Sequence, residues 1–181
     1  MEPIYEKRIA SSLGRITVRC SDRGLRQLAF ESAPEKKTPR NGRAAHSANP
    51  INANGQNAPG ARWAYQAVKE LEEYLAGRRT QFTVPLDLDG TAFQKKVWQA
   101  LCRIPYGETR SYGEVARQVG NPRAARAVGM ANHENPAAIV VPCHRVIRGD
   151  GRLGGYGGGR RKKSALLRLE QTGSASQRKP A

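Results

Sequence analysis

The fold of the second half of this chain is decided by residues 111–126, which read SYGEVARQVGNPRAAR. Ser111 and Glu114 have the spacing of a capping box, which begins a helix by satisfying its first free amide groups. Gly120 ends that helix, and we expect Asn121 to cap a second one, with the following proline in its first turn. Two short helices joined by so tight a turn predict a helix-turn-helix.

The net charge of +16 is unevenly distributed around this motif. Residues 91–173 hold fifteen Lys and Arg against five Asp and Glu, whereas residues 1–90 hold fourteen against ten. A basic half beside a nearly balanced half favours contact between the second half and a polyanion. A basic protein that is merely soluble is the alternative interpretation. An anionic membrane would require a basic amphipathic helix with a bulky apolar face, and the sequence contains none, so we expect no membrane partner.

The three cysteines, Cys20, Cys102 and Cys143, form an odd set at irregular spacing, which predicts free thiols in a reducing compartment. The strand pattern around Cys20 and the helix pattern around Cys102 predict buried structural thiols. No pair of cysteines or histidines has the spacing of a structural zinc site, so we expect no metal. The N-terminus lacks the apolar segment of a signal peptide, and no run of 18 or more apolar residues occurs. We therefore expect a cytoplasmic protein.

The first half predicts a small separate domain, residues 1–88. Alternating apolar and polar residues predict a strand near residues 16–21, which pairs through a tight turn with residues 25–30. A helical stripe begins at Trp63 and ends before Gly77. Between hairpin and helix, residues 32–61 are rich in Ala, Asn, Pro and Gly, which predicts a flexible linker or insertion.

The second domain, residues 89–173, is predicted to be mainly helical. A capping box at Thr91-x-x-Gln94 begins one helix, and a last helix runs from Arg160 to about Glu170. Residues 174–181 are polar and predict a disordered tail. The fold class is therefore α+β, with a small antiparallel-sheet and helix domain followed by a mainly helical domain that carries the helix-turn-helix.

Cys143 differs from the other two cysteines. An apolar run, residues 139–141, predicts a short buried strand that leads into Pro-Cys-His-Arg. The cationic neighbours His144 and Arg145 would lower the pKa of the Cys143 thiol and make it a nucleophile, although a coincidental Cys-His pair stays open. Because successive residues of a strand point to opposite sides, His144 would act as a base through a bridging water.

A glycine-rich segment, residues 149–159, contains seven glycines and no phosphate-binding motif. One interpretation is that its backbone closely approaches a flat ligand beside Cys143, which Tyr156 could stack on or hydrogen-bond. The other is a flexible surface loop.

Several motifs in fixed order resemble the O6-alkylguanine-DNA alkyltransferases, also called methylated-DNA–protein-cysteine methyltransferases. The active-site signature of that family is IVVPCHRVI at residues 139–147. The other matching motifs are GTAFQ at 90–94, VW at 97–98, IPYGET at 104–109, SYGE at 111–114, RAVG at 126–129, ANHENP at 131–136, GGYGGG at 154–159 and LLRLE at 166–170. The resemblance covers nearly all of residues 62–171 and, less specifically, the hairpin at 13–30.

The resemblance implies direct-reversal repair of double-stranded DNA. An alkyl group would pass from O6-alkylguanine to Cys143 after nucleotide flipping, irreversibly, once per molecule and without a cofactor. O4-alkylthymine as a second substrate stays open. His144 would take the thiol proton through a water, Glu170 would orient His144, and Tyr112 would donate towards the guanine leaving group. Asn135 would brace the turn between the recognition helix and the active-site strand.

The resemblance also implies that the helix-turn-helix enters the minor groove, where Arg126 replaces the flipped nucleotide in the duplex. The implied DNA contacts are Ser111, Tyr112, Asn121, Arg123, Ala125 and Arg126. The implied base pocket is lined by Val146, Gly154, Tyr156 and Gly157. Gly157 stands where family members often carry Ser or Ala, and Ala138 stands where some carry Pro, which bears on bulky alkyl groups. We expect a monomer.

Three other functions stay open at this point. Proteins related to the family bind alkylated DNA without repairing it, but they lack the cysteine. A helix-turn-helix transcription regulator would use Arg123 and Arg126 and leave Cys143 incidental. A Cys–His hydrolase would need donors for an oxyanion and would turn over repeatedly.

Overall fold

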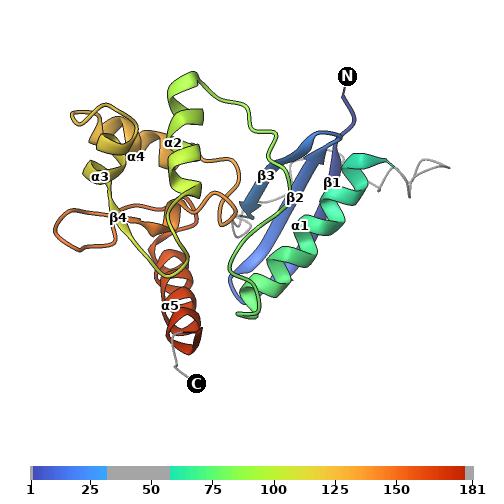
Figure 1. Ribbon diagram of the computed structural model, residues 1–181. Helices are drawn as coiled ribbons and strands as arrows, with labels where there is room; N and C mark the ends of the chain where they lie inside the picture. The colour runs from blue at the N-terminus through green and yellow to red at the C-terminus, as the bar shows by residue number, and fades with distance from the viewer. Residues whose placement is uncertain (1, 32–57, 178–181) are drawn as a thin grey trace, which may run out of the picture.

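The computed structural model of the chain describes residues 2–31 and 58–177. A three-stranded sheet covered by one helix is followed by a mainly helical half, which confirms the predicted α+β class (Figure 1). Most of the segment predicted as a linker, residues 32–57, lies outside the described residues, and the domain boundary near residue 88 stays a prediction. In the described part of the chain, no helix is both long and apolar enough to cross a bilayer.

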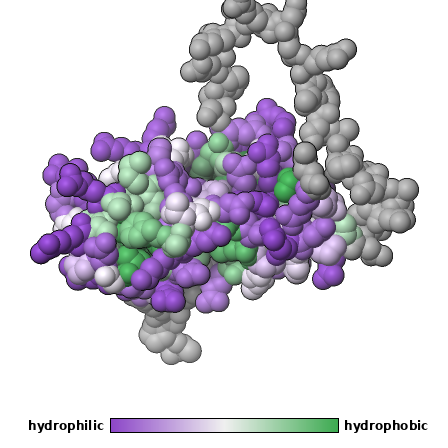
Figure 2. Space-filling model, turned by 90° about the horizontal axis from the view of Figure 1, so that it is seen from above, coloured by the Kyte–Doolittle hydropathy of each residue, from purple (hydrophilic) through white to green (hydrophobic). Residues whose placement is uncertain are grey.

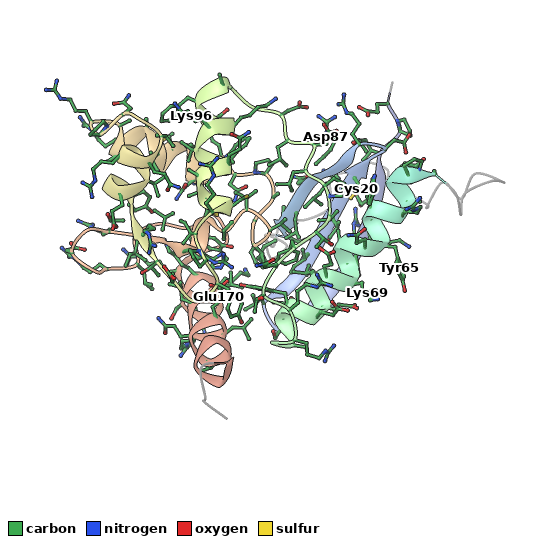
Figure 3. The ribbon with its side chains drawn as sticks, viewed as in Figure 1. Cys20, Tyr65, Lys69, Asp87, Lys96 and Glu170 are labelled. Atoms are coloured by element: carbon green, nitrogen blue, oxygen red, sulfur yellow. The ribbon has the colours of Figure 1, made fainter. Side chains whose placement is uncertain are left out.

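The sheet is antiparallel in the order β1 (Tyr5–Ser11), β2 (Gly14–Ser21) and β3 (Gly24–Phe30). The predicted hairpin is thus confirmed as β2 and β3. Strand β1 was not predicted, because this edge strand contains no fully buried residue and its charged residues obscure the alternation. Cys20 is buried between the sheet and the helix that covers it, as expected, and burial raises the pKa of its thiol to about 12 (Figure 3).

Helix α1 (Pro59–Leu75) packs on the sheet and ends before Gly77, whose φ of 71° suits glycine. The first three residues of the helix fall in the predicted linker, so residues 59–61 were assigned wrongly. The Gly60 amide donates to the Asp22 carboxylate at 2.9 Å. A Cβ atom on Gly60 would lie 2.3 Å from the Tyr5 ring, so this glycine allows close packing rather than flexibility.

The second half begins with α2 (Ala92–Cys102), whose predicted capping box of Thr91 and Gln94 is present. Cys102 is the last residue of α2 and is exposed, so the prediction of a buried thiol is wrong. The apolar stripe of this helix ends at Leu101, and the next residue faces away from it.

The helix-turn-helix consists of α3 (Tyr112–Gln118) and α4 (Ala125–His133), which lie side by side (Figure 1). The predicted capping box at Ser111 is present, and Gly120, with a φ of 79°, follows the end of α3. The predicted start of the second helix is wrong, because α4 begins at Ala125 without a side-chain cap. The Asn121 carbonyl instead accepts from the Ala124 amide at 2.9 Å, and this turn leaves Arg123 ahead of the helix.

The apolar run at residues 139–141 is buried but forms a turn, not the predicted strand. Ile139 has a φ of 73°, and the Val141 amide bonds to the Ala137 carbonyl at 2.9 Å. A short apolar run cannot distinguish a buried turn from a strand by pattern alone. The chain then forms a 3₁₀ helix, η1 (Cys143–Arg145).

The strand β5 (Val146–Ile147) follows η1 directly and pairs in parallel with β4 (Arg110–Ser111). The last helix, α5 (Arg160–Gln177), begins where predicted but extends well past Glu170. Residues 174–177, predicted as part of a disordered tail, therefore have a helical backbone, and residues 178–181 lie outside the described part. Figure 3 shows Glu170 on the part of α5 that meets the rest of the molecule.

Candidate active site

Cys143 is the first residue of η1 and is 5% exposed. Its Sγ atom accepts a hydrogen bond from Nδ2 of Asn135 at 3.1 Å, and the same Nδ2 donates to the Val141 carbonyl at 2.8 Å. The Asn135 carbonyl oxygen accepts from the Ala137 amide at 3.0 Å. Asn135 therefore braces the turn that leads from α4 into η1 and also positions the sulfur.

The pKa of the Cys143 thiol is raised, mainly by burial. The hydrogen bond from Asn135 and the positive charge of Lys163 oppose this effect only in part. The expectation that His144 and Arg145 lower this pKa is wrong, because both side chains turn towards Glu170 instead. At neutral pH the sulfur is thus mainly a thiol, and its reaction as a nucleophile requires a base.

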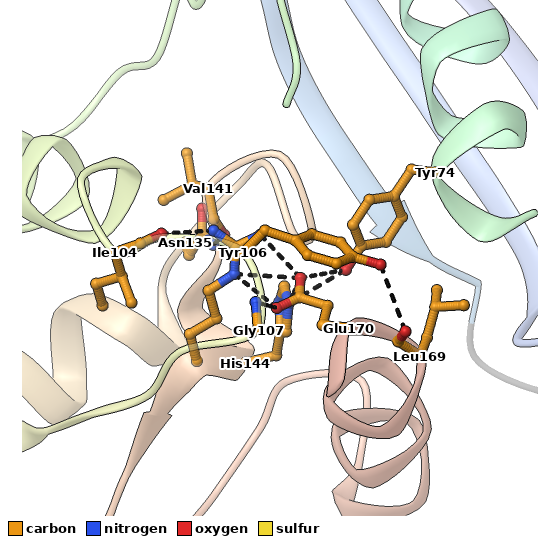
Figure 4. Close-up of polar contacts among 10 residues, drawn as sticks. Tyr74, Ile104, Tyr106, Gly107, Asn135, Val141, His144, Leu169 and Glu170 are labelled. Atoms are coloured by element: carbon orange, nitrogen blue, oxygen red, sulfur yellow. Dashed lines mark hydrogen bonds and ion pairs between the residues drawn. The ribbon is translucent and has the colours of Figure 1, made fainter. Parts of the chain in front are cut away.

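The candidate base is His144, which belongs to a cluster of side chains that contact Glu170 (Figure 4). Nε2 of His144 lies 2.9 Å from Oε1 of Glu170, and both side chains are fully buried. The Tyr74 hydroxyl donates to the same oxygen at 2.6 Å, and the Arg145 guanidinium donates to both carboxylate oxygens at 2.8–3.1 Å. The Gly107 amide donates to Oε2 at 3.1 Å. Burial raises the pKa of Glu170, but the bonds from His144 and Arg145 outweigh burial and lower it to about 2.

The ionised Glu170 determines the tautomer of His144. A carboxylate only accepts hydrogen bonds, so the proton of neutral His144 is on Nε2, and Nδ1 is the free base. Among the described residues, Nδ1 of His144 has no hydrogen-bond partner. Burial lowers the pKa of His144, and Glu170 opposes this in part, so the imidazole is neutral and able to accept a proton.

A cavity of about 260 Å³ adjoins Cys143. It is lined by Tyr112, Gly129, Asn132, His133, Cys143, Gly155, Tyr156 and Gly157. Of the four residues predicted for the base pocket, Tyr156 and Gly157 line it. Gly154 packs behind Tyr112, since a Cβ atom there would lie 3.1 Å from the tyrosine oxygen, and Val146 is buried in β5 outside the lining.

Lys163 also lies near Cys143, although it was not predicted as a site residue. It is fully buried, and its Nζ donates to the Val146 carbonyl and, at 3.1 Å, to the Gly155 carbonyl, which joins β5 to the glycine-rich segment. Burial lowers the pKa of Lys163 to about 8, although the nearby Cys143 opposes the shift. Helical periodicity could have revealed it, because Lys163 lies on one face of α5 with Leu166 and Glu170.

The family models for the 6-O-methylguanine DNA methyltransferase ribonuclease-like domain and DNA binding domain match residues 4–88 and 92–172. A methylated-DNA–protein-cysteine methyltransferase of Methanosarcina barkeri is 40% identical over 168 residues, which are 93% of this chain and 98% of that protein. The chain belongs to the 6-O-methylguanine DNA methyltransferase family. The resemblance found in the motifs is thereby confirmed.

Other members of the methyltransferase family show the same likeness. The match to a Mycobacterium leprae relative is 63% identical over 106 residues but covers 59% of this chain and only 64% of the relative. The crystal structure of Mycobacterium tuberculosis O6-methylguanine methyltransferase has a TM-score of 0.74 and 44% identity, covering 99% of this chain and 96% of that one. A structure of Mycobacterium tuberculosis OGT in complex with DNA has a TM-score of 0.75 at 44% identity, covering 93% of each chain.

The surface of the helix-turn-helix carries most of the residues predicted to contact DNA. Arg123 and Arg126 are exposed, and neither takes part in an ion pair within the described residues. Asn121 is exposed and Ala125 is half-buried, whereas the Ser111 hydroxyl is occupied by the capping box. Figure 2 shows apolar surface at the end of the molecule that carries α3 and α4, with hydrophilic side chains around it.

Proposed function

We propose that the protein repairs alkylated double-stranded DNA by moving the alkyl group of O6-alkylguanine to Sγ of Cys143. The observation that carries the proposal is the position of this sulfur, at the wall of a cavity and next to the Asn135 amide. Directly after Cys143 in the chain comes a buried histidine whose Nε2 faces an ionised Glu170 and whose Nδ1 has no partner in the part of the chain that the structure describes. A thiol, an imidazole base and a carboxylate that orients the base are the groups that convert a buried thiol into a nucleophile.

The reaction balances with the residues present. The Cys143 thiol gives its proton to Nδ1 of His144 through a water, and Glu170 stabilises the resulting imidazolium. The thiolate attacks the alkyl carbon and forms a C–S bond, while the bond from carbon to O6 breaks and its electron pair stays on the guanine. Tyr112, at the cavity wall, donates towards the leaving guanine. Attack at a saturated carbon develops no oxyanion, and the thioether product is not cleaved by any group in this site, so one molecule reacts once.

The DNA side of the proposal rests on the helix-turn-helix. Arg123 and Arg126 are free to contact the duplex, and Arg126 fills the place of the nucleotide that is flipped into the cavity. We propose that the protein acts as a monomer on chromosomal DNA in the cytoplasm. Cys143 also distinguishes this chain from relatives that bind alkylated DNA without repair, and its cavity argues against a simple transcription regulator.

A titration tests the proposed function. Increasing amounts of duplex DNA that contains O6-methylguanine are incubated with a fixed amount of protein, and the repaired guanine is counted. Wild type and Cys102→Ala, which removes the exposed thiol, should both remove one methyl group per protein. Cys143→Ala should remove none but still bind the duplex, because Cys143 is buried and offers no contact to the DNA backbone. Removal of several methyl groups per protein would contradict the single-turnover mechanism.

A further inference from the structure

A basic groove lies where the first turns of α5 meet the turn between β1 and β2. Its volume is about 680 Å³, and it shares no lining residue with the cavity beside Cys143. Among the lining residues that the structure describes, none is acidic. The polar residues of its walls are Ser12, Arg160, Arg161, Lys162, Ser164 and Arg168, of which four are cationic.

The protein itself does not neutralise these four cations. In the described ranges, 2–31 and 58–177, none of them forms an ion pair with a carboxylate. The three arginines are exposed, and Nζ of Lys162 lies over the Phe30 ring, 5.0 Å from its centroid. The first turn of α5 contains no acidic residue, so the positive end of the helix dipole adds to the cluster. Because like charges repel one another, the groove favours an anionic partner.

The spacing of residues along α5 explains why the cations border a hollow. Arg160, Ser164 and Arg168 are four residues apart and therefore lie in one row on the helix surface. The small side chains of Ser164 and Ala165 separate the arginines, so the surface between them is recessed. Guanidinium, ammonium and hydroxyl groups are the donors with which proteins bind phosphate oxygens. The groove thus has the chemistry for a chain of phosphates.

The groove and the helix-turn-helix belong to different ends of the second half. Helix α4 packs against α2 and α3, whereas α5 packs against η1. In Figure 1, α3 and α4 lie at one end of this half, and α5 projects from the other. Beyond the cavity the chain approaches the sheet, since a Cβ atom on Gly158 would lie 2.7 Å from the Phe30 ring. A duplex that lies on α4 therefore leaves the groove accessible.

The occupant that fits the groove best is DNA, which is the polyanion that this family binds. Leu13 is the one large apolar side chain among the described lining residues, whereas an anionic membrane requires a bulky apolar face. We propose that the groove binds the phosphate backbone of a second DNA duplex while the helix-turn-helix holds the first. One protein molecule then bridges two DNA segments. This inference goes beyond alkyl transfer and does not require it.

A bridging experiment tests the second surface. A duplex fixed to beads is saturated with protein, the excess is washed away, and a fluorescent duplex is added at about 50 mM salt, where phosphate contacts are strong. The fluorescence retained on the beads is measured. The groove variant replaces three exposed arginines (Arg160→Gln, Arg161→Gln and Arg168→Gln). The matched control removes the same three charges from exposed, unpaired positions of the sheet-bearing half (Arg62→Gln, Lys69→Gln and Arg78→Gln).

Wild type and the control should both retain the fluorescent duplex. The groove variant should retain at least about fivefold less, because it has lost three phosphate contacts. Cys143→Ala should bridge like wild type, since the groove contains no part of the active site. Equal retention by wild type and the groove variant, or no retention by wild type, overturns the second surface.

Two rates complete the test. Reaction of Cys143 with the free base O6-benzylguanine, which needs no flipping, should be the same in wild type, groove variant and control, because the fold is intact. If the triple variant loses this reaction, the three single substitutions carry the comparison. Repair of O6-methylguanine in one isolated short duplex should also be unchanged. A repair rate that falls as far as bridging does would place the groove on the first duplex and overturn the proposal. Bridging without any repair would contradict the proposed function alone.

Discussion

Glu170 is the side chain on which the buried polar cluster of the active site depends. It accepts hydrogen bonds from Tyr74 on α1, from His144 and Arg145 in η1, and from the backbone amide of Gly107. The bond from Tyr74 connects the sheet-covering helix with the last helix of the chain. Glu170 therefore stabilises the fold and sets the tautomer of His144 with the same carboxylate.

Replacement of Glu170 by glutamine should lower the free energy of unfolding by about 3 kcal/mol, because it leaves Arg145 buried without its counter-charge. The matched control is Glu108→Gln, which breaks an exposed pair with Arg110 and should cost less than about 1 kcal/mol. Urea denaturation at neutral pH measures both. An equal loss of unfolding free energy in the two variants would show that the buried cluster stabilises the fold no more than an exposed ion pair does.

The pH dependence of stability follows from the same carboxylate. Its pKa is about 2 in the folded protein against 4.5 as the ordinary value, so the unfolded chain binds more protons between these limits. The contribution of Glu170 is present above about pH 4.5 and is lost as the pH falls towards 2. The difference in stability between wild type and Glu170→Gln should therefore shrink over that range.

Lys163 should support the thiolate of Cys143. Lys163→Met removes a buried positive charge near the sulfur, which raises the pKa of the thiol and slows alkyl transfer at neutral pH by about tenfold per unit of pKa. Lys162→Met is the matched control, because Lys162 lies over the Phe30 ring at 5.0 Å instead. Lys163 loses its charge above about pH 8, so the difference in the rate of alkyl transfer between Lys163→Met and wild type should become smaller there. Equal rates of alkyl transfer for Lys163→Met and Lys162→Met at pH 7 would show that Lys163 does not support the thiolate.

At the scale of single residues, the sequence predicted which side chains belong to the candidate site but not what surrounds them. Cys143, His144, Tyr112 and Asn135 could be named because the active-site motifs are local. Lys163 and Tyr74 escaped notice because their partners are distant along the chain. The thiol pKa was predicted in the wrong direction, because neighbours in sequence were taken for neighbours of the sulfur.

At the scale of single elements, the exposed face of α4 is predicted to assist nucleotide flipping through Arg126. Flipping a nucleotide costs a few kcal/mol of lost stacking and pairing, and Arg126 is proposed to offset part of this cost. Arg126→Ala should therefore slow repair of O6-methylguanine in duplex DNA but barely change the reaction with free O6-benzylguanine. Second-order rate constants of wild type and Arg126→Ala with each substrate show whether the substitution affects only the duplex reaction. If both reactions slow equally, Arg126 serves the pocket or the fold and not the duplex.

The helices were easier to predict than the short connections. Capping boxes at Thr91 and Ser111 mark two helix starts in the sequence, and the structure has both. The start of α4 was predicted too early, because Asn-Pro is also a good turn, and the Asn121 carbonyl closes a turn there. Residues 139–141 were predicted as a strand, although the positive φ of Ile139 makes them a turn. Such turns depend on bonds to distant segments, as between Ala138 and Leu28, which no local pattern contains.

The charge distribution of the whole molecule predicts how it binds undamaged duplex DNA. The affinity should fall steeply between roughly 50 and 200 mM salt, because cations of the second half displace counterions from phosphates. Arg123→Ala should reduce the slope of log affinity against log salt by about one. Arg78→Ala, a substitution in the sheet-bearing half, should leave the slope unchanged. Affinity that does not depend on salt would contradict the proposed basic surface.

The central claim is that Cys143 accepts the alkyl group because the fold activates and presents it. The three thiols of the chain provide an internal comparison, since Cys102 is exposed, whereas Cys20 and Cys143 are buried. The most direct measurement is peptide mass spectrometry after incubation with duplex DNA that contains O6-methylguanine. We predict one methyl group per protein, on the peptide with Cys143 and on no other. Methylation of the exposed Cys102, or an unmodified protein after the methyl group has left the DNA, would contradict the account.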